Sequence, residues 1–164
     1  NKGWDNSIPN AEYFNELERV SKNQIIWGGN YFLDHLKATS CMIVWDKKSS
    51  DGSDFADCEL AWTSFKTAVR KFKYDWVGFG YLNNPHGERK EHPTQKPVAL
   101  YEWLLTNYAK QGDKILDTHL GSGSHAIACN NLGFELTACE LDKDYYEASI
   151  KRIHQATAQE RLFA

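Results

Sequence analysis

One stretch near the C-terminus constrains the fold more than any other part of the chain. Lys114–Asp117 reads as a strand, Gly121–Ser124 as a tight turn, and His125–Leu132 as a helix. Residues 134–139 then form the next strand, and Asp142 is placed to cap a final helix. Because strands that alternate with helices pair in parallel, this pattern predicts an α/β fold, with a mostly parallel sheet covered by helices on both faces.

The rest of the chain supplies further elements of the same kind. Residues 11–20 have apolar positions at helical spacing, and a second helix is expected from Pro97 to near Gly112. Short apolar runs predict three strands, at residues 24–27, 41–45 and 59–63. The sequence shows no internal repeat, and its 164 residues suit a single domain, 1–164.

Composition excludes several classes of protein. The chain has 41% apolar and 25% charged residues, which is typical of a soluble globular protein and not of a disordered one. It has no apolar run of about 18 residues and no signal-peptide pattern at its start, which predicts a cytoplasmic protein without a membrane partner. The four cysteines lack CxxC spacing, so we expect neither a metal site nor a disulfide framework, but reduced thiols in the core.

The glycine turn is the first candidate binding site. A strand that runs into glycines before a helix presents backbone N–H groups to a ligand, and a side chain there would hold the ligand off. Glu140, nineteen residues after Gly121, is placed to accept hydrogen bonds from a ribose. A dinucleotide fits this pattern, but Asp117 would repel a pyrophosphate. It suits instead a cofactor with an ammonium and a sulfonium, such as S-adenosylmethionine.

Two other segments are candidates for binding. In His92–Pro97, two prolines fix the backbone around three polar side chains just before a helix. Residues 64–96 carry a local charge of +4 in a chain whose net charge is −3, which is expected of a surface that meets a polyanion. A solvated loop with incidental lysines remains the alternative, and the aromatics of this segment are as well suited to a small core as to stacking on bases.

These motifs, in this order, resemble the amino-methyltransferases that modify exocyclic amines in DNA. The string His92–Pro97, then Asp117–Ser124, then Glu140-Leu141-Asp142 is similar to the permuted beta group, in which the cofactor half follows the catalytic half. Residues 25–32 and 59–64 are similar to upstream stretches of phage and bacterial members. The resemblance implies a Rossmann-like methyltransferase fold with an added antiparallel hairpin, S-adenosylmethionine as cofactor and double-stranded DNA as partner.

The resemblance also implies roles for single residues. Asp117 and the turn would hold the cofactor, Glu140 its ribose, and the loop after His92 its methionine end. The cofactor-binding candidates are His92, Thr94, Gln95, Lys96, Asp117, His119, Gly121, Gly123, Ser124 and Glu140. Residues 64–91 correspond to a short target-recognition insert, and 92–164 to the cofactor-binding half. The DNA-binding candidates are Lys66, Arg70, Lys71, Lys73, Arg89 and Lys90.

The chain departs from the family pattern in two places. His119 stands where the family usually has phenylalanine, which changes the packing beside the cofactor. The catalytic tetrapeptide, Asp/Asn/Ser-Pro-Pro-Tyr/Phe, occurs nowhere in these residues, so no catalytic residue is assigned. In the permuted order it should lie just before Asn1, and we therefore expect a domain that is incomplete at its N-terminus.

The predicted function is site-specific methylation of adenine N6 in DNA, in a restriction-modification or phage setting. Cytosine N4 is the alternative target. A non-catalytic DNA-binding module with a vestigial cofactor fold and a dinucleotide oxidoreductase are the alternatives from other classes. A homodimer is left open.

Overall fold

The computed structural model describes residues 8–47, 56–76 and 94–160 of the chain. The chain divides into two compact units, an N-terminal unit of residues 1–76 and a C-terminal unit of residues 77–164. The boundary at Trp76 falls inside the predicted target-recognition insert. Whether the chain acts as one domain stays a prediction.

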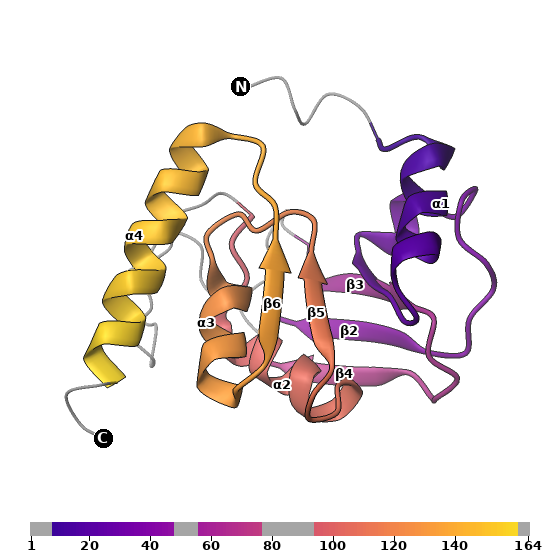
Figure 1. Ribbon diagram of the computed structural model, residues 1–164. Coiled ribbons are helices and arrows are strands. Elements are labelled where there is room, and N and C mark those ends of the chain that lie inside the picture. Colours follow the sequence, from indigo (N-terminus) through magenta and orange to yellow (C-terminus); the bar gives the residue numbers. More distant parts are fainter. Residues whose placement is uncertain (1–7, 48–55, 77–93, 161–164) are drawn as a thin grey trace. The chain divides into compact units, whose positions relative to one another are not determined.

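The N-terminal unit begins with helix α1 (Ala11–Val20), drawn in indigo in Figure 1. Asn10 caps it, because its side-chain oxygen accepts a hydrogen bond from the Tyr13 N–H at 3.2 Å. Phe14 is the buried residue of the helix, and its ring stacks on that of His35 with the centroids 4.9 Å apart. The helix is therefore anchored by one aromatic side chain and a polar cap.

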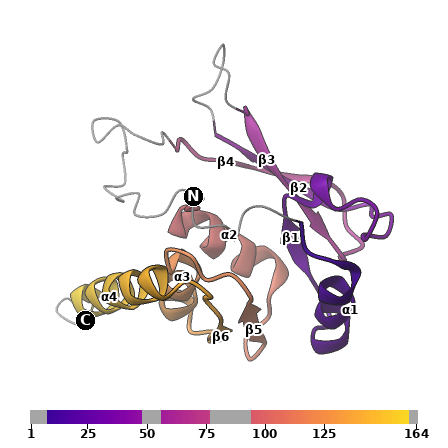
Figure 2. The ribbon, with the colours of Figure 1, turned by 90° about the horizontal axis from the view of Figure 1, so that it is seen from above.

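A four-stranded sheet forms the body of this unit (Figure 2). Its strands are β1 (Ile25–Trp27), β2 (Met42–Asp46), β3 (Cys58–Thr63) and β4 (Arg70–Lys73), and a short 3₁₀ turn, η1 (Gly29–Tyr31), follows β1. The strand order is β1-β3-β2-β4. β3 pairs antiparallel with both neighbours, whereas β2 and β4 are parallel.

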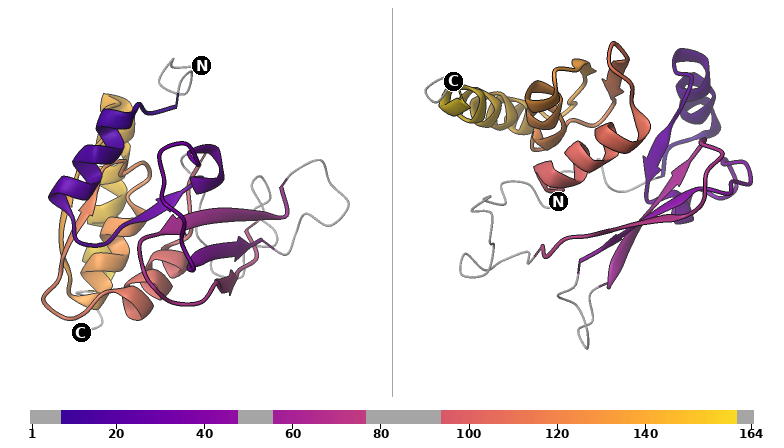
Figure 3. Two further views of the ribbon diagram at one scale, coloured as in Figure 1. Left: turned by 90° about the vertical axis from the view of Figure 1, so that its right-hand side faces the viewer. Right: turned by 90° about the horizontal axis from the view of Figure 1, so that it is seen from below.

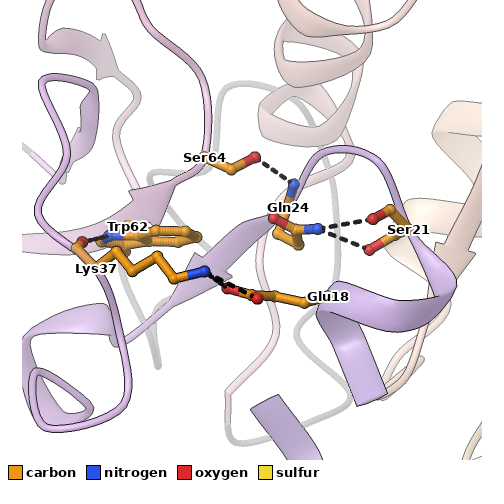
Figure 4. A network of polar contacts seen from close by, with 6 residues as sticks. All are labelled: Glu18, Ser21, Gln24, Lys37, Trp62 and Ser64. Atoms are coloured by element: carbon orange, nitrogen blue, oxygen red, sulfur yellow. Dashed lines mark hydrogen bonds and ion pairs between the residues drawn. The ribbon is translucent and has the colours of Figure 1, made fainter. Parts of the chain in front are cut away.

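Polar contacts at the start of β1 tie α1 to this sheet (Figure 4). The backbone N–H of Gln24 donates to the hydroxyl of Ser64 at 2.9 Å, and its side-chain amide donates to Ser21. In the same network, the Trp62 indole N–H donates to the Lys37 carbonyl oxygen at 2.8 Å. The bonds of Gln24 satisfy polar groups where the helix passes into the first strand.

The C-terminal unit has the βαβα order that the sequence predicts (Figure 1). Its helices are α2 (Val98–Tyr108), α3 (Ser124–Leu132) and α4 (Lys143–Glu160), and its strands are β5 (Lys114–Asp117) and β6 (Glu135–Ala138). The two strands are parallel and in register, with Lys114 opposite Glu135. Their carboxyl ends consequently lie at one edge of the sheet.

Helices α2 and α3 pack together and cover one face of this small sheet (Figure 3). Leu105, Ala128 and Cys129 form the buried centre, and Ile115 and Leu136 reach it from the strands. Alternate residues of β5 and β6 are more exposed, as a pleated strand requires. Burial of apolar surface thus fixes the register that places the loops after both strands.

The predicted α/β class and the antiparallel hairpin are confirmed, but the sheet is less uniformly parallel than the sequence suggested. The described strands belong to two sheets, and only the β5–β6 sheet is wholly parallel. The connection from Asp46 to Cys58 is short for a parallel crossover, which needs about a dozen residues or more, so β2 and β3 pair as a hairpin.

Strand β4 was not predicted. Three of its four residues are cations, which hides the apolar alternation of a strand. It lies at the edge of its sheet, where charged side chains discourage pairing with another chain.

Candidate functional site

The loops after β5 and β6 bring together the two carboxylates singled out in the sequence. Asp117 ends β5, and its carbonyl oxygen accepts the N–H of Cys139 at 2.8 Å. The carbonyl oxygen of Cys139 in turn accepts the N–H of Leu120 at 2.9 Å. The backbone ladder therefore continues past the strands and holds the glycine turn, residues 121–124, beside Glu140.

Glu140 joins the two loops through its side chain. One carboxylate oxygen accepts the N–H of Gly121 at 2.8 Å, and the other accepts the N–H of Asp142 at 2.9 Å. A carboxylate has about four lone-pair sites, so each oxygen keeps one for a further donor. Glu140 can thus fix the turn and still accept a hydrogen bond from a ligand hydroxyl.

Asp117 is held by two partners. One of its oxygens accepts the backbone N–H of His119 at 2.9 Å, and the other lies 2.9 Å from Nδ1 of His125. Burial acts to raise the pKa of this carboxyl, but the hydrogen bond and charge of His125 and the N–H of His119 outweigh it. The pKa of Asp117 therefore lies below its ordinary value, and the site holds a negative charge at neutral pH.

The two glycines of the turn have backbone conformations that favour glycine. Gly121 and Gly123 both have positive φ, 55° and 80°. A Cβ on Gly123 would come within 3.0 Å of Ile153 and 3.4 Å of Ser149, both in α4. Close packing of the turn against a helix is therefore a further structural reason for glycine at Gly123, and its role toward a ligand stays a prediction.

Arg152 is a residue of this site that sequence reasoning missed. From α4 its guanidinium donates to the carbonyl oxygen of Ser122 at 2.7 Å and to the hydroxyl of Ser124 at 3.0 Å. Ser124 is only 2% exposed. The Arg152 side chain thus stabilises the turn from helix α4. The sequence pattern of the glycine motif does not include this position, so the motif could not indicate it.

The loop before α2 is described from Thr94 onward. Gln95 is buried, Lys96 is half-buried and Thr94 is exposed. His119 is exposed, and its Nδ1 lies 2.9 Å from the hydroxyl of Thr118. His92 lies outside the described residues. The cofactor-binding roles of all these residues stay predictions.

The described DNA-binding candidates belong to the N-terminal unit. Arg70, Lys71 and Lys73 are exposed along β4, and Lys71 pairs with Asp46 at 3.4 Å. Lys66 is also exposed and lines a groove of about 460 Å³. Arg89 and Lys90 lie outside the described residues. Their contacts with DNA stay predictions.

Two aromatics that follow β4 belong to the core. Tyr74 and Trp76 are buried, and Trp76 packs on Trp45 with ring centroids 6.5 Å apart. Phe72 of β4 is half-buried and stacks on Tyr74, with ring centroids 5.8 Å apart. Of the two roles considered for aromatics of the basic segment, Tyr74 and Trp76 have the structural one.

No helix in the ranges 8–47, 56–76 and 94–160 is long and apolar enough to cross a bilayer. In the same ranges, no cluster of three or more histidine, cysteine or acidic side chains is arranged to hold a metal ion.

The sequence matches a protein-family model and several individual proteins. The model of a family described as DNA methylase matches residues 9–151. The chain is 35% identical over 75 residues to Type II methyltransferase M.HpaI of Haemophilus parainfluenzae, covering 46% of the chain and 24% of the relative. It is 31% identical over 107 residues to Type II methyltransferase M2.DpnII of Streptococcus pneumoniae, covering 65% and 33%. The matches thus span about a third or less of these curated relatives.

The fold is also found among solved structures. The crystal structure of the M1.HpyAVI–SAM complex matches with a TM-score of 0.62 and 23% identity, over 88% of this chain and 83% of that chain. At that identity the likeness concerns the fold.

Proposed function

The chain belongs to the DNA methylase family, and on that premise we propose that it transfers a methyl group from S-adenosylmethionine to an exocyclic amine of double-stranded DNA. Adenine N6 is the proposed target, with cytosine N4 as the alternative. The observation that supports this most is the edge where Asp117 and Glu140 flank a glycine turn. M1.HpyAVI, which shares the fold, was crystallised as a SAM complex.

The residues at this edge fit such a cofactor. Glu140 keeps acceptor capacity for ribose hydroxyls after bonding two backbone N–H groups. Asp117 keeps its negative charge in a largely buried place, which favours a ligand with an ammonium group. When bound, S-adenosylmethionine supplies an activated methyl group. The chain would hold it with Asp117, Gly121, Gly123, Ser124 and Glu140, and its methionine end with Thr94, Gln95 and Lys96. His92 and His119 are further candidates for contact with the cofactor.

The basic residues are proposed to hold DNA. Lys66, Arg70, Lys71 and Lys73 are exposed cations that can contact phosphates, and Arg89 and Lys90 carry the same charge in sequence. Phosphate contacts position a duplex without reading its sequence. An exocyclic amine cannot be reached within the base stack, so the target base has to be extruded.

The test is methyl transfer by the full-length protein from labelled S-adenosylmethionine to unmethylated duplex DNA, followed by digestion and chromatography of the nucleosides. Label in N6-methyladenine supports the proposal, whereas label in N4-methylcytosine replaces the adenine target with the alternative. Binding of S-adenosylhomocysteine and DNA without transfer would point to a non-catalytic module. A melting temperature raised by a nicotinamide cofactor and not by S-adenosylhomocysteine would favour an oxidoreductase.

A further inference from the structure

His125 lies in the first turn of α3, next to Asp117 of the candidate cofactor site. Its Nδ1 lies 2.9 Å from Asp117, and the side chains of the two residues are 15% and 14% exposed. Its ring stacks on Tyr101 of α2, with centroids 4.6 Å apart and planes 14° from parallel. The side chain therefore links the end of β5 to two helices.

We propose that His125 is a positioning residue that orients the carboxylate of Asp117 toward the cofactor. This role rests on the proposed function, since it concerns the same site. His125 would not touch the cofactor itself; it acts through Asp117.

The geometry of Asp117 supports this role. The backbone N–H of His119 holds one carboxylate oxygen, and Nδ1 of His125 holds the other. With both oxygens engaged from different directions, the carboxylate has one orientation. Each oxygen keeps a lone pair, so the bonds that orient it do not prevent it from accepting a ligand donor.

The hydrogen bond also defines the state of the imidazole. An ionised carboxylate can only accept, so Nδ1 has to carry the proton. In the neutral ring Nε2 is then the acceptor. Stacking on Tyr101 fixes the plane of the ring and thereby the direction of its N–H.

Because Asp117 is largely buried, its hydrogen bond to His125 is important for keeping the carboxylate charged and in place. The charge of Asp117 also acts on Cys129, which lies one turn after His125 in α3. The pKa of the Cys129 thiol is raised to about 11, first by burial and then by that charge. Without the N–H of His125, a desolvated carboxylate would lose one of two partners and either turn toward solvent or take up a proton.

Two substitutions separate this role from packing. His125→Phe keeps a flat ring on Tyr101 but has no N–H. His125→Asn loses the ring but places an amide N–H at the position of Nδ1. If His125 positions Asp117, the His125→Asn variant should bind S-adenosylhomocysteine more tightly than His125→Phe. If His125 only fills space, His125→Phe should bind more tightly.

The experiment measures S-adenosylhomocysteine binding to the full-length protein by titration calorimetry at pH 7.5, with thermal unfolding of each variant in parallel. We expect H125F to bind about tenfold more weakly than wild type, as loss of a hydrogen bond to a charged group predicts, and H125N to stay within about threefold. Equal affinities, or affinities that follow packing so that H125N is the weaker, would overturn the proposal. A wild-type protein that binds no S-adenosylhomocysteine would overturn the proposed function instead.

A measurement on the wild type covers the case in which H125F does not fold. Imidazole ¹⁵N chemical shifts, recorded at a pH where the ring is neutral, report which nitrogen carries the proton. We expect the Nδ1–H form for His125. The Nε2–H form would overturn the proposal, because that ring cannot donate to Asp117.

Discussion

The glycine-turn site of the C-terminal unit and the basic strand β4 of the N-terminal unit are both charged and both predicted to bind, yet they are built differently. Asp117 and Glu140 are partly buried, and each carboxylate oxygen has a short bond to a named partner. Lys71 of β4 has a side chain that is 51% exposed and a 3.4 Å ion pair.

This difference separates two kinds of binding. Where bonds and packing fix each group, a small change of shape should be costly. Where exposed charges act through solvent, single changes should be small and depend on salt.

The largest effect is expected from Gly123→Ala. Its φ of 80° is strained for alanine, and the new Cβ would meet Ile153 at 3.0 Å. Left-handed strain of about 1–2 kcal/mol and overpacking of about 1–3 kcal/mol together predict a loss of about 2–5 kcal/mol in the free energy of unfolding, measured by urea denaturation. Gly112→Ala is the matched control, since φ there is 90° but nothing lies within 4 Å. Equal losses in the two variants would show that packing against α4 is not what the turn requires.

Glu140→Gln should come next. The amide would turn an N–H₂ group toward the backbone N–H of Gly121 or Asp142, which removes one bond and adds a repulsion. Losing a hydrogen bond of a charged group costs about 1.5–3 kcal/mol, so S-adenosylhomocysteine should bind roughly 10- to 150-fold more weakly by calorimetry. Glu135→Gln is the control on the neighbouring strand, where the side chain is 67% exposed. An unchanged affinity for E140Q would remove Glu140 from the site.

Acid should affect the Asp117 side of the site in a defined direction. Burial opposes the charge of Asp117, but His125 and the His119 N–H keep the pKa of the folded carboxyl below the unfolded value of about 3.9. Its contribution to stability is therefore complete above that value and is lost as the pH falls toward the folded pKa. The difference in unfolding free energy between wild type and Asp117→Asn should not shrink between pH 7 and 5, and it should shrink below about pH 4. A difference that already shrinks near pH 6 would contradict a lowered pKa.

The sequence predicts those structural features whose determining residues lie close together in the chain. Lys114–Asp117 matches β5 because an apolar run next to a glycine turn leaves few alternatives. Asp142 caps α4 as expected, accepting the N–H of Asp144 and Tyr145. Such signals lie within a few residues of their effect.

The features that were missed depend on distant partners. His125 reads as an ordinary first-turn residue until the fold places Asp117 and Tyr101 beside it. Arg152 braces a turn some thirty residues earlier in the chain. β4 is a strand because β2 offers it an edge, although its own residues favour solvent. A single sequence carries no sign of these pairings.

The smallest effect is expected on the basic strand. If Lys73 contacts a phosphate, the affinity of Lys73→Gln for DNA should depend less steeply on salt. The negative slope of log affinity against log salt should become smaller in magnitude by about 0.9, in a titration of duplex DNA followed by fluorescence anisotropy. Folding stability should change by less than about 0.5 kcal/mol, because the side chain is exposed. Lys114→Gln, an exposed lysine of the other unit, should leave the slope unchanged. If K73Q instead abolished binding at every salt concentration, β4 would be a shaped site like the glycine turn, and the contrast between the two regions would fail.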